Sequence, residues 1–375
     1  MRLNPYGRTG RRVSAVGFGG MRFDLTRSEE ENADLVRYAC SKGINYFDTA
    51  PNYCSDRSES IFGLAFRDMP SRFHVSTKAM PVSADTAEKA RESVMKSLDR
   101  LGVPKIHFFH VWCLREMEHF ELAMRPGGEY EGLLACQEER LIDHIVFSSH
   151  QPGSEIRRVL ETGKFEGVLM GVNILNFPYR WDGAQAAVEG GYGVVAMNPL
   201  AGGEVPKHAD SLHFLSREGE SPTEAALRFI IGAPQITVAL VGFTDREQVD
   251  TACRVAENAE PFTETELQRI RERLGRDMDS LCTACGYCDG CPKNIPIPSY
   301  MQVYNERLMF SKTDEEMLNR VSHHLNWGIL VGRRASAGDC IECGQCEEAC
   351  TQRLDIVNRL KAMAEWERQL AEKGS

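Results

Sequence analysis

The chain has 375 residues, of which 42% are hydrophobic and 26% are charged, and its formal net charge is −10. The length allows two domains, although a single α/β barrel can occupy about 250 residues, and the composition is that of an ordinary globular protein. The acidic balance argues against a nucleic-acid partner, because phosphate binding needs a basic face. No apolar stretch approaches the length needed to cross a bilayer, so we expect no membrane association.

Residues 1–260 alternate between short β-rich segments and amphipathic helical segments, the pattern of repeated βα units. The expected strands cover 13–19, 44–49, 73–78, 105–112, 144–149, 167–173, 193–198 and 236–242. The expected helices cover 28–42, 58–67, 85–101 and 133–139, and one more begins at Pro222. This alternation favours a (β/α)8 barrel over a doubly wound sheet, because no G-x-G-x-x-G follows the first strand.

The C-terminal part of the sequence contains two further helical segments, 261–275 and 299–330, and two runs of closely spaced cysteines. The cysteines of the first run are Cys282, Cys285, Cys288 and Cys291, and those of the second are Cys340, Cys343, Cys346 and Cys350. A thiolate at every third residue lets one loop hold three corners of an iron–sulfur cube, and the fourth cysteine usually reaches across to the other cluster. The crossed pattern pairs Cys350 with the first three cysteines and Cys291 with Cys340, Cys343 and Cys346.

Other interpretations of these cysteines are weaker. Two zinc sites remain a minority alternative, because four cysteines in one run exceed what one tetrahedral site needs. A disulfide framework is typical of short secreted chains. The N-terminus has a positive start but no apolar h-region, so we expect a cytoplasmic protein in a reducing compartment. The scattered cysteines are interpreted as small apolar residues: Cys40, Cys54, Cys113, Cys136 and Cys253.

A barrel carries its chemistry at the C-terminal ends of its strands. Asp48 ends the second expected strand, Tyr53 follows it, Lys78 ends the third and His110 lies near the end of the fourth. Singly, each has a structural interpretation: a turn cap, an aromatic residue at the edge of the core, a surface charge or a core histidine. Together, on neighbouring strand ends, they indicate a catalytic set.

These residues carry a family resemblance. The segments FDTAPNY, STK and FFHVW resemble the catalytic segments of the aldo-keto reductases, and residues 8–23 and 196–203 resemble the opening segment and the seventh strand of that family. The tail resembles a bacterial ferredoxin with two [4Fe–4S] clusters. The whole chain is similar to the iron–sulfur branch of the family. The resemblance implies a (β/α)8 TIM barrel over 1–275 and a small, mainly helical ferredoxin-like domain over 276–375.

The resemblance also implies roles for the rim residues. Tyr53 would donate the proton to a small carbonyl substrate, because a lysine ammonium beside a tyrosine makes its hydroxyl a better acid. Lys78 would supply that ammonium, Asp48 would pair with Lys78, and His110 would orient the carbonyl. A nicotinamide would supply the hydride, and the reverse reaction is equally accessible.

The expected cofactor contacts follow from the same resemblance: Gly20, Met21, Asp48, Ser148, Ser149, Asn173, Met197, Pro199, Leu200, Gly242, Phe243, Thr244 and Gln248. Met197 stands where the family often stacks an aromatic residue. Family members that prefer NADPH usually place a cation beside Gly242, whereas here Arg246 is the only cation near that position in the sequence. The choice between NADH and NADPH therefore stays open.

Clusters move single electrons, whereas a nicotinamide transfers a hydride, so the two halves need an intermediary. One hypothesis is an oxidoreductase whose clusters exchange electrons through a flavin or a redox partner protein. A second is a reductase whose clusters only brace the tail. The third is a non-catalytic redox sensor or electron-transfer and docking protein that uses the barrel as a scaffold.

Overall fold

The computed structural model describes residues 1–70, 72–274, 280–283, 285–326 and 328–374. The chain forms two compact units, which are treated separately below. The first unit contains Met1–Leu200 and Leu215–Leu267, and the second contains Ala201–Phe214 and Gln268–Ser375. The expected boundary between 275 and 276 lies outside the described residues. The internal segment 201–214 belongs with the C-terminal residues, which the sequence did not suggest.

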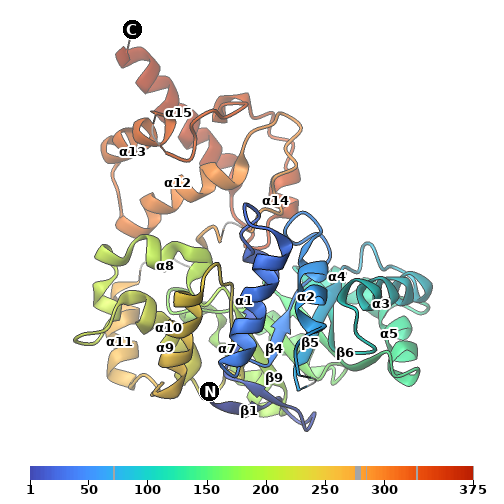
Figure 1. Cartoon of the computed structure of the whole chain (residues 1–375). Coiled ribbons are helices and arrows are strands. Elements are labelled where there is room, and N and C mark those ends of the chain that lie inside the picture. Colours follow the sequence, from blue (N-terminus) through green and yellow to red (C-terminus); the bar gives the residue numbers. More distant parts are fainter. Residues whose placement is uncertain (71, 275–279, 284, 327, 375) are drawn as a thin grey trace. The chain divides into compact units, whose positions relative to one another are not determined.

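The first unit is a closed barrel of parallel strands in the order β10-β3-β4-β5-β6-β7-β8-β9. Figure 1 shows several of these strands, including β4, β5, β6 and β9, among the helices. The strands are β3 (Val16–Gly19), β4 (Tyr46–Asp48), β5 (His74–Ala79), β6 (Ile106–Leu114), β7 (Ile142–Ser149), β8 (Gly167–Gly171), β9 (Gly193–Met197) and β10 (Val238–Val241). The predicted (β/α)8 barrel is therefore confirmed. Each of the eight expected strands contains one of these barrel strands or overlaps it.

The first expected strand, 13–19, is wrong in one respect. Only β3 enters the barrel, whereas β2 (Arg12–Ser14) pairs antiparallel with β1 (Leu3–Pro5) in a separate hairpin. The break falls at Ser14, whose hydroxyl donates to the carbonyl of Val16 at 2.6 Å. The hairpin places Tyr6 and Val13 in the hydrophobic cluster of the barrel interior.

Helices follow the strands, as expected from the alternating pattern. They are α1 (Glu29–Ser41), α2 (Ser58–Phe66), α3 (Ala87–Leu101), α4 (Met117–Met124), α5 (Glu129–Glu138), α6 (Gly153–Glu161), α7 (Phe177–Gly190), α9 (Pro222–Gly232), α10 (Arg246–Glu257) and α11 (Glu264–Arg273). Local chemistry sets several ends: Ser28 and Ser221 form capping boxes, and Gly102 ends α3 with a φ of 61°.

The barrel interior is layered. Residues that share its hydrophobic cluster come from most strands, namely Tyr46, Phe108, Val146, Leu169, Val195, Val238 and Leu240. Because side chains two residues apart on a strand share a face, the next inward positions on four of these strands are Asp48, His110, Ser148 and Met197. An apolar layer therefore supports a polar layer nearer the C-terminal strand ends.

The second unit is mainly helical. Its helices are α8 (Glu204–Lys207), α12 (Ile297–Phe310), α13 (Asp314–Asn326), α14 (Gln345–Ala349) and α15 (Ile356–Gly374). The single helical stretch expected over 299–330 is two helices, because Ser311 adopts a φ of 48° and ends α12. None of the described helices combines the length and apolar character that a membrane span requires.

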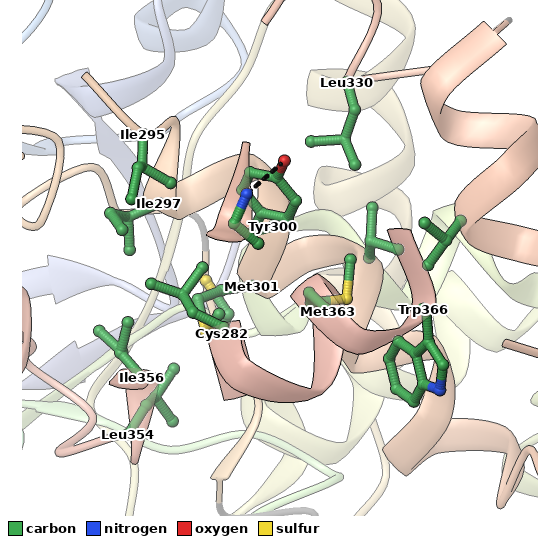
Figure 2. Packing of buried hydrophobic residues seen from close by; sticks show 14 of the residues in the cluster. Cys282, Ile295, Ile297, Tyr300, Met301, Leu330, Leu354, Ile356, Met363 and Trp366 are labelled. Atoms are coloured by element: carbon green, nitrogen blue, oxygen red, sulfur yellow. Dashed lines mark hydrogen bonds between the residues drawn. The ribbon is translucent and has the colours of Figure 1, made fainter. Parts of the chain in front are cut away.

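The core of the second unit gathers apolar side chains from α12, α13 and α15 around three of the clustered cysteines, Cys282, Cys288 and Cys350. Figure 2 shows Cys282 beside Met301, with Leu354 and Ile356 close by. The Tyr300 hydroxyl donates to Glu367 at 2.7 Å and accepts from the backbone N–H of Ala337 at 3.0 Å. Helix α12 thus ties α15 to the segment that leads into the second cysteine run.

Candidate functional site

A buried ion pair lies at the C-terminal ends of β4 and β5. The Nζ atom of Lys78 is 2.6 Å from Oδ1 of Asp48, and the two residues are 1% and 2% exposed. The sheet register brings them together, because Asp48 lies opposite Ser76, two residues before Lys78. A buried charge is stable only when it is paired and hydrogen-bonded, and here each charge supplies the other's partner.

Ser76 joins this pair to His110. Its hydroxyl lies 2.7 Å from Oδ2 of Asp48 and 2.8 Å from Nε2 of His110. Since its single hydrogen goes to the carboxylate, Nε2 of His110 is the donor to Ser76. Burial, with help from Lys78, lowers the pKa of His110 to about 4, so the ring is neutral at pH 7. Sequence reasoning missed Ser76, because only the sheet register shows what it bridges.

Tyr53 lies beside Lys78 in the loop after β4. The Lys78 ammonium is 5.3 Å from the centre of the Tyr53 ring, and the ring packs edge-on against Trp112 at 5.7 Å. Asn52 and Cys54, which flank Tyr53, both have φ between 54° and 67°. Such left-handed conformations are strained for residues with side chains, and they concentrate at functional sites. The structure thus brings Asp48, Tyr53 and Lys78 together.

The polar residues expected to contact the nicotinamide make internal bonds. The Ser148 hydroxyl accepts from the N–H of Cys113 at 2.8 Å, and the Ser149 hydroxyl donates to the carbonyl of Leu114 at 2.9 Å. Asn173 accepts from the N–H of Leu175 at 2.9 Å and donates to the carbonyl of Asn198 at 3.2 Å. These bonds fix the three side chains at the ends of β7 and β8.

The rim residues after β8 and β9 include small and apolar side chains. Gly171, the last residue of β8, carries no side chain, and a Cβ atom there would lie 3.6 Å from Nδ1 of His150 and 3.9 Å from Cε of Met197. Met197 is partly exposed, Pro199 is buried and Leu200 is partly exposed. Gly20 and Met21 open a short 3₁₀ turn, and the Gly20 carbonyl accepts from Ser58 at 2.9 Å.

Two arginines that sequence reasoning missed, Arg22 and Arg27, lie next to the loop after β10. Gly242 is exposed, and a Cβ atom there would lie 2.8 Å from the side chain of Arg22. Arg27 donates to the carbonyl of Thr244 at 3.0 Å. Arg246 is the only cation near Gly242 in the sequence, and the structure adds Arg22 and Arg27, which are distant in sequence. Arg246 lies over the ring of Tyr38, 4.7 Å from its centre.

The other residues of this loop are already engaged. Phe243 is fully buried and packs edge-on against Phe18 at 5.2 Å. The Gln248 side chain accepts from the N–H of Thr244 at 3.0 Å and donates to its hydroxyl at 2.9 Å. Thr244 and Gln248 therefore stabilise the loop, whereas Gly242 is exposed and allows the close approach of Arg22.

In the second unit the cysteines gather around two spaces. The first space is lined by Cys282, Cys285, Cys288 and Cys350, together with Met301, Leu354 and Ile356. The second space is lined by Cys291, Cys340, Cys343 and Cys346, together with Ile297, Val357 and Leu360. This grouping is the crossed one that the spacing predicts. Four thiols around each space are the donor set of a four-iron cluster.

Backbone N–H groups donate to two of these thiols, from Glu342 to Cys340 and from Leu354 to Cys350, each at 3.4 Å. In the described parts of the chain, no group of three or more Cys, His, Asp or Glu side chains is arranged to hold a single metal ion. Asn305 is fully buried, and its amide binds both the N–H and the carbonyl of Cys282 at 2.8 Å. Thr351 is buried, with its hydroxyl 3.5 Å from Sγ of Cys285.

Comparison with known proteins agrees with both halves. Residues 15–274 match the aldo/keto reductase family model, and residues 281–354 match the 4Fe-4S dicluster domain. L-galactose dehydrogenase of Arabidopsis thaliana is 27% identical over 74% of this chain and 92% of its own length. Pyridoxal 4-dehydrogenase of Microbacterium luteolum is 36% identical, over 34% of this chain and 49% of its own length.

Solved structures share the barrel. The holo form of an aldo-keto reductase from Bacillus halodurans is 21% identical, with a TM-score of 0.61, and covers 73% of this chain and 97% of its own. At that identity the likeness concerns the fold. The family match spans most of the chain, however. The chain is therefore an oxidoreductase of the aldo/keto reductase family whose sequence continues into a 4Fe-4S dicluster domain.

Proposed function

We propose that this oxidoreductase reduces a small polar carbonyl compound, or oxidises the corresponding alcohol, with Tyr53 as the proton donor and acceptor. The observation that carries the proposal is the buried pair of Lys78 and Asp48, whose ammonium lies 5.3 Å from the centre of the Tyr53 ring. A fixed positive charge beside a phenol stabilises its anion, so the hydroxyl gives up its proton more readily. Asp48 keeps that charge in place.

His110 has a supporting role in this proposal. Its neutral ring donates to Ser76, which donates to Asp48, so the three residues hold the carboxylate facing Lys78. Preorganised dipoles of this kind need no rearrangement when charge develops at the substrate. The role in orienting the carbonyl, expected from the family resemblance, stays a prediction.

A bound nicotinamide would supply or accept the hydride in this reaction. The open position at Gly171 and the thioether of Met197 suit a flat ring. Arg22 and Arg27 flank the loop at Gly242, so their cations favour a phosphate on the adenosine end of the cofactor. We therefore expect NADPH to bind more tightly than NADH.

The substrate class is proposed from the relatives. One acts on L-galactose and another on pyridoxal, by their names. Both are small, polar compounds with an aldehyde or a hemiacetal carbon. The first substrates to test are therefore aldoses and hydroxylated aromatic aldehydes.

For the C-terminal unit we propose two [4Fe–4S] clusters, one in each cysteine-lined space. Clusters that exchange electrons with the barrel chemistry need a two-electron to one-electron converter, either a flavin or a redox partner protein. Redox-silent clusters in a potentiometric titration would leave them a structural role.

Replacement of Tyr53 by Phe tests the catalytic part. We expect Tyr53→Phe to lower kcat by about 10²- to 10⁴-fold, the usual contribution of a general acid, with iron content unchanged. Tyr130→Phe is the matched control, because Tyr130 lies on α5 and donates to a backbone carbonyl of Lys164. Undiminished turnover in Tyr53→Phe would remove the proton-donor assignment, and no turnover of any test substrate by the native protein would favour the redox-sensor alternative.

A further inference from the structure

The two cysteine-lined spaces have unequal surroundings. In the first, Cys282, Cys288 and Cys350 are buried, whereas the second includes Cys343, which is exposed, next to Ile341, which is 56% exposed. A more negative cluster is harder to accommodate away from water, because a low dielectric disfavours charge. A cluster in the first space therefore depends more strongly on nearby protein charges.

A buried cation lies beside the first space. Arg359, on α15, is 9% exposed. Its guanidinium donates to the carbonyl of Ser280 at 3.0 Å, two residues before Cys282, and lies over the ring of Tyr304 at 5.1 Å. These two contacts hold the charge close to the start of the first cysteine run.

This cation has no carboxylate partner within ion-pair distance in the described parts of the chain. Its electrostatic neighbours, from the strongest to the weakest, are the hydroxyl of Tyr304, the thiols of Cys282 and Cys350, and Asp355. The Asp355 carboxylate accepts instead from Asn358 at 3.0 Å. A buried charge is costly unless it is compensated. The arrangement is that of a counter-charge for an anion in the first space, and a cluster with four thiolate ligands is such an anion.

We infer that Arg359 sets the reduction potential of a [4Fe–4S] cluster held by Cys282, Cys285, Cys288 and Cys350. Uptake of one electron from a one-electron donor makes this cluster one unit more negative without a proton. A fixed positive charge stabilises the reduced form more than the oxidised form and raises the midpoint potential. The inference rests on the proposed cluster assignment.

The same helix supplies a matched control. Lys361, two residues further along α15, is exposed and pairs with Glu342 at 2.8 Å. Its electrostatic neighbours include Cys340 of the second space. Because water and a carboxylate screen Lys361, its removal has a much smaller effect on any cluster than removal of Arg359.

The experiment is a potentiometric titration of the anaerobically purified full chain, followed by electron paramagnetic resonance. We expect Arg359→Gln to lower one midpoint potential by at least 59 mV, which is a tenfold change in a one-electron equilibrium, and to leave the other unchanged. Arg359→Lys keeps the charge and most of the native potential, and Lys361→Gln changes neither cluster appreciably.

The outcomes separate the two proposals. A native protein without [4Fe–4S] signals overturns the cluster assignment itself. Two intact clusters whose potentials are the same in Arg359→Gln and in the native chain overturn only the role of Arg359. If Arg359→Gln fails to assemble clusters, the Arg359→Lys variant tests the role of the charge. Normal assembly with near-native potentials in Arg359→Lys supports that role. Failed assembly in Arg359→Lys overturns it, because the guanidinium geometry rather than the charge is then required.

Discussion

The barrel rim and the cysteine-lined spaces of the C-terminal unit differ in how their polar groups are satisfied. At the rim, Lys78, Asp48, Ser76 and His110 are bonded to one another. In the C-terminal unit, four thiols face each space, and the nearby Arg359 has a backbone carbonyl and a ring as partners. The polypeptide alone therefore builds the charge arrangement of the rim, whereas the thiols of the C-terminal unit face spaces that the proposed clusters would fill.

The difference has consequences for stability as well as for chemistry. A rim whose charges are already paired keeps its geometry whether or not substrate is present. A core built partly from cysteine ligands couples folding to the cofactor, because ligation free energy becomes folding free energy.

The largest expected effect follows from withholding iron. Cys282, Cys288 and Cys350 belong to the hydrophobic cluster of the C-terminal unit, so we expect protein made without iron to lose fixed structure there. Hydrogen exchange should show α12 and α15 unprotected, while β5 and β6 keep their protection. Equal protection of both units with and without iron would show that the C-terminal unit folds unaided, and the contrast would fail.

The second largest expected effect follows from breaking the ion pair of Lys78 and Asp48. We expect Lys78→Met to destabilise the barrel by about 3–5 kcal/mol, because it leaves the Asp48 carboxylate buried without its cation. The double variant Asp48→Asn with Lys78→Met should recover most of the loss. Urea unfolding, followed by hydrogen exchange in the barrel strands, measures both. A cost below 1 kcal/mol for the single variant would mean that the rim is not organised by this pair.

The smallest expected effect concerns a buried acidic residue of the barrel, which differs from the paired charges of the rim. Glu129 on α5 is fully buried, and neither of its carboxyl oxygens has a hydrogen-bond partner in the structure. Burial raises its pKa well above the usual range. Above the unfolded pKa, of about 4.3, the folded state holds this proton while the unfolded state releases it. Stability therefore falls as pH rises towards the raised pKa.

Two substitutions at this position test the exception. Glu129→Gln should flatten the pH dependence between pH 5 and pH 8, and Glu129→Met should stabilise the barrel by about 1–3 kcal/mol, the cost of an unsatisfied buried polar group. Thermal unfolding at several pH values measures both effects. A native pH profile in Glu129→Gln would show that this carboxyl does not carry the dependence.

The parts of the fold that the sequence predicted are those set by local patterns. Alternating strands and helices located the barrel, and cysteine spacing predicted which thiols share a space. The hairpin of β1 and β2 was not predicted, because the pairing of β2 with residues 3–5 does not follow from the composition of 13–19. The break between α12 and α13 escaped because Ser311 carries no strong stop signal.

Contacts between residues distant in sequence also limited the prediction of the sites. Asp48, Tyr53 and Lys78 were predicted because each occupies a recognisable motif at a strand end. Ser76, Arg22 and Arg27 were not, because each acts through a residue distant in sequence: His110, Gly242 and Thr244. A short motif reports which residue types are present, whereas long-range contacts decide which of them meet.

The segment 201–214 limits how far the chain can be divided. Directly after β9 it joins the C-terminal residues in one compact unit, where Gly202 approaches the backbone of Thr283 and His208 packs against Phe310 at 4.9 Å. A stop codon placed after the barrel would thus also remove the packing partners of an internal stretch translated much earlier. The dicluster region therefore cannot be removed without disturbing residues 201–214, although its place at the end of the sequence suggests an independent domain.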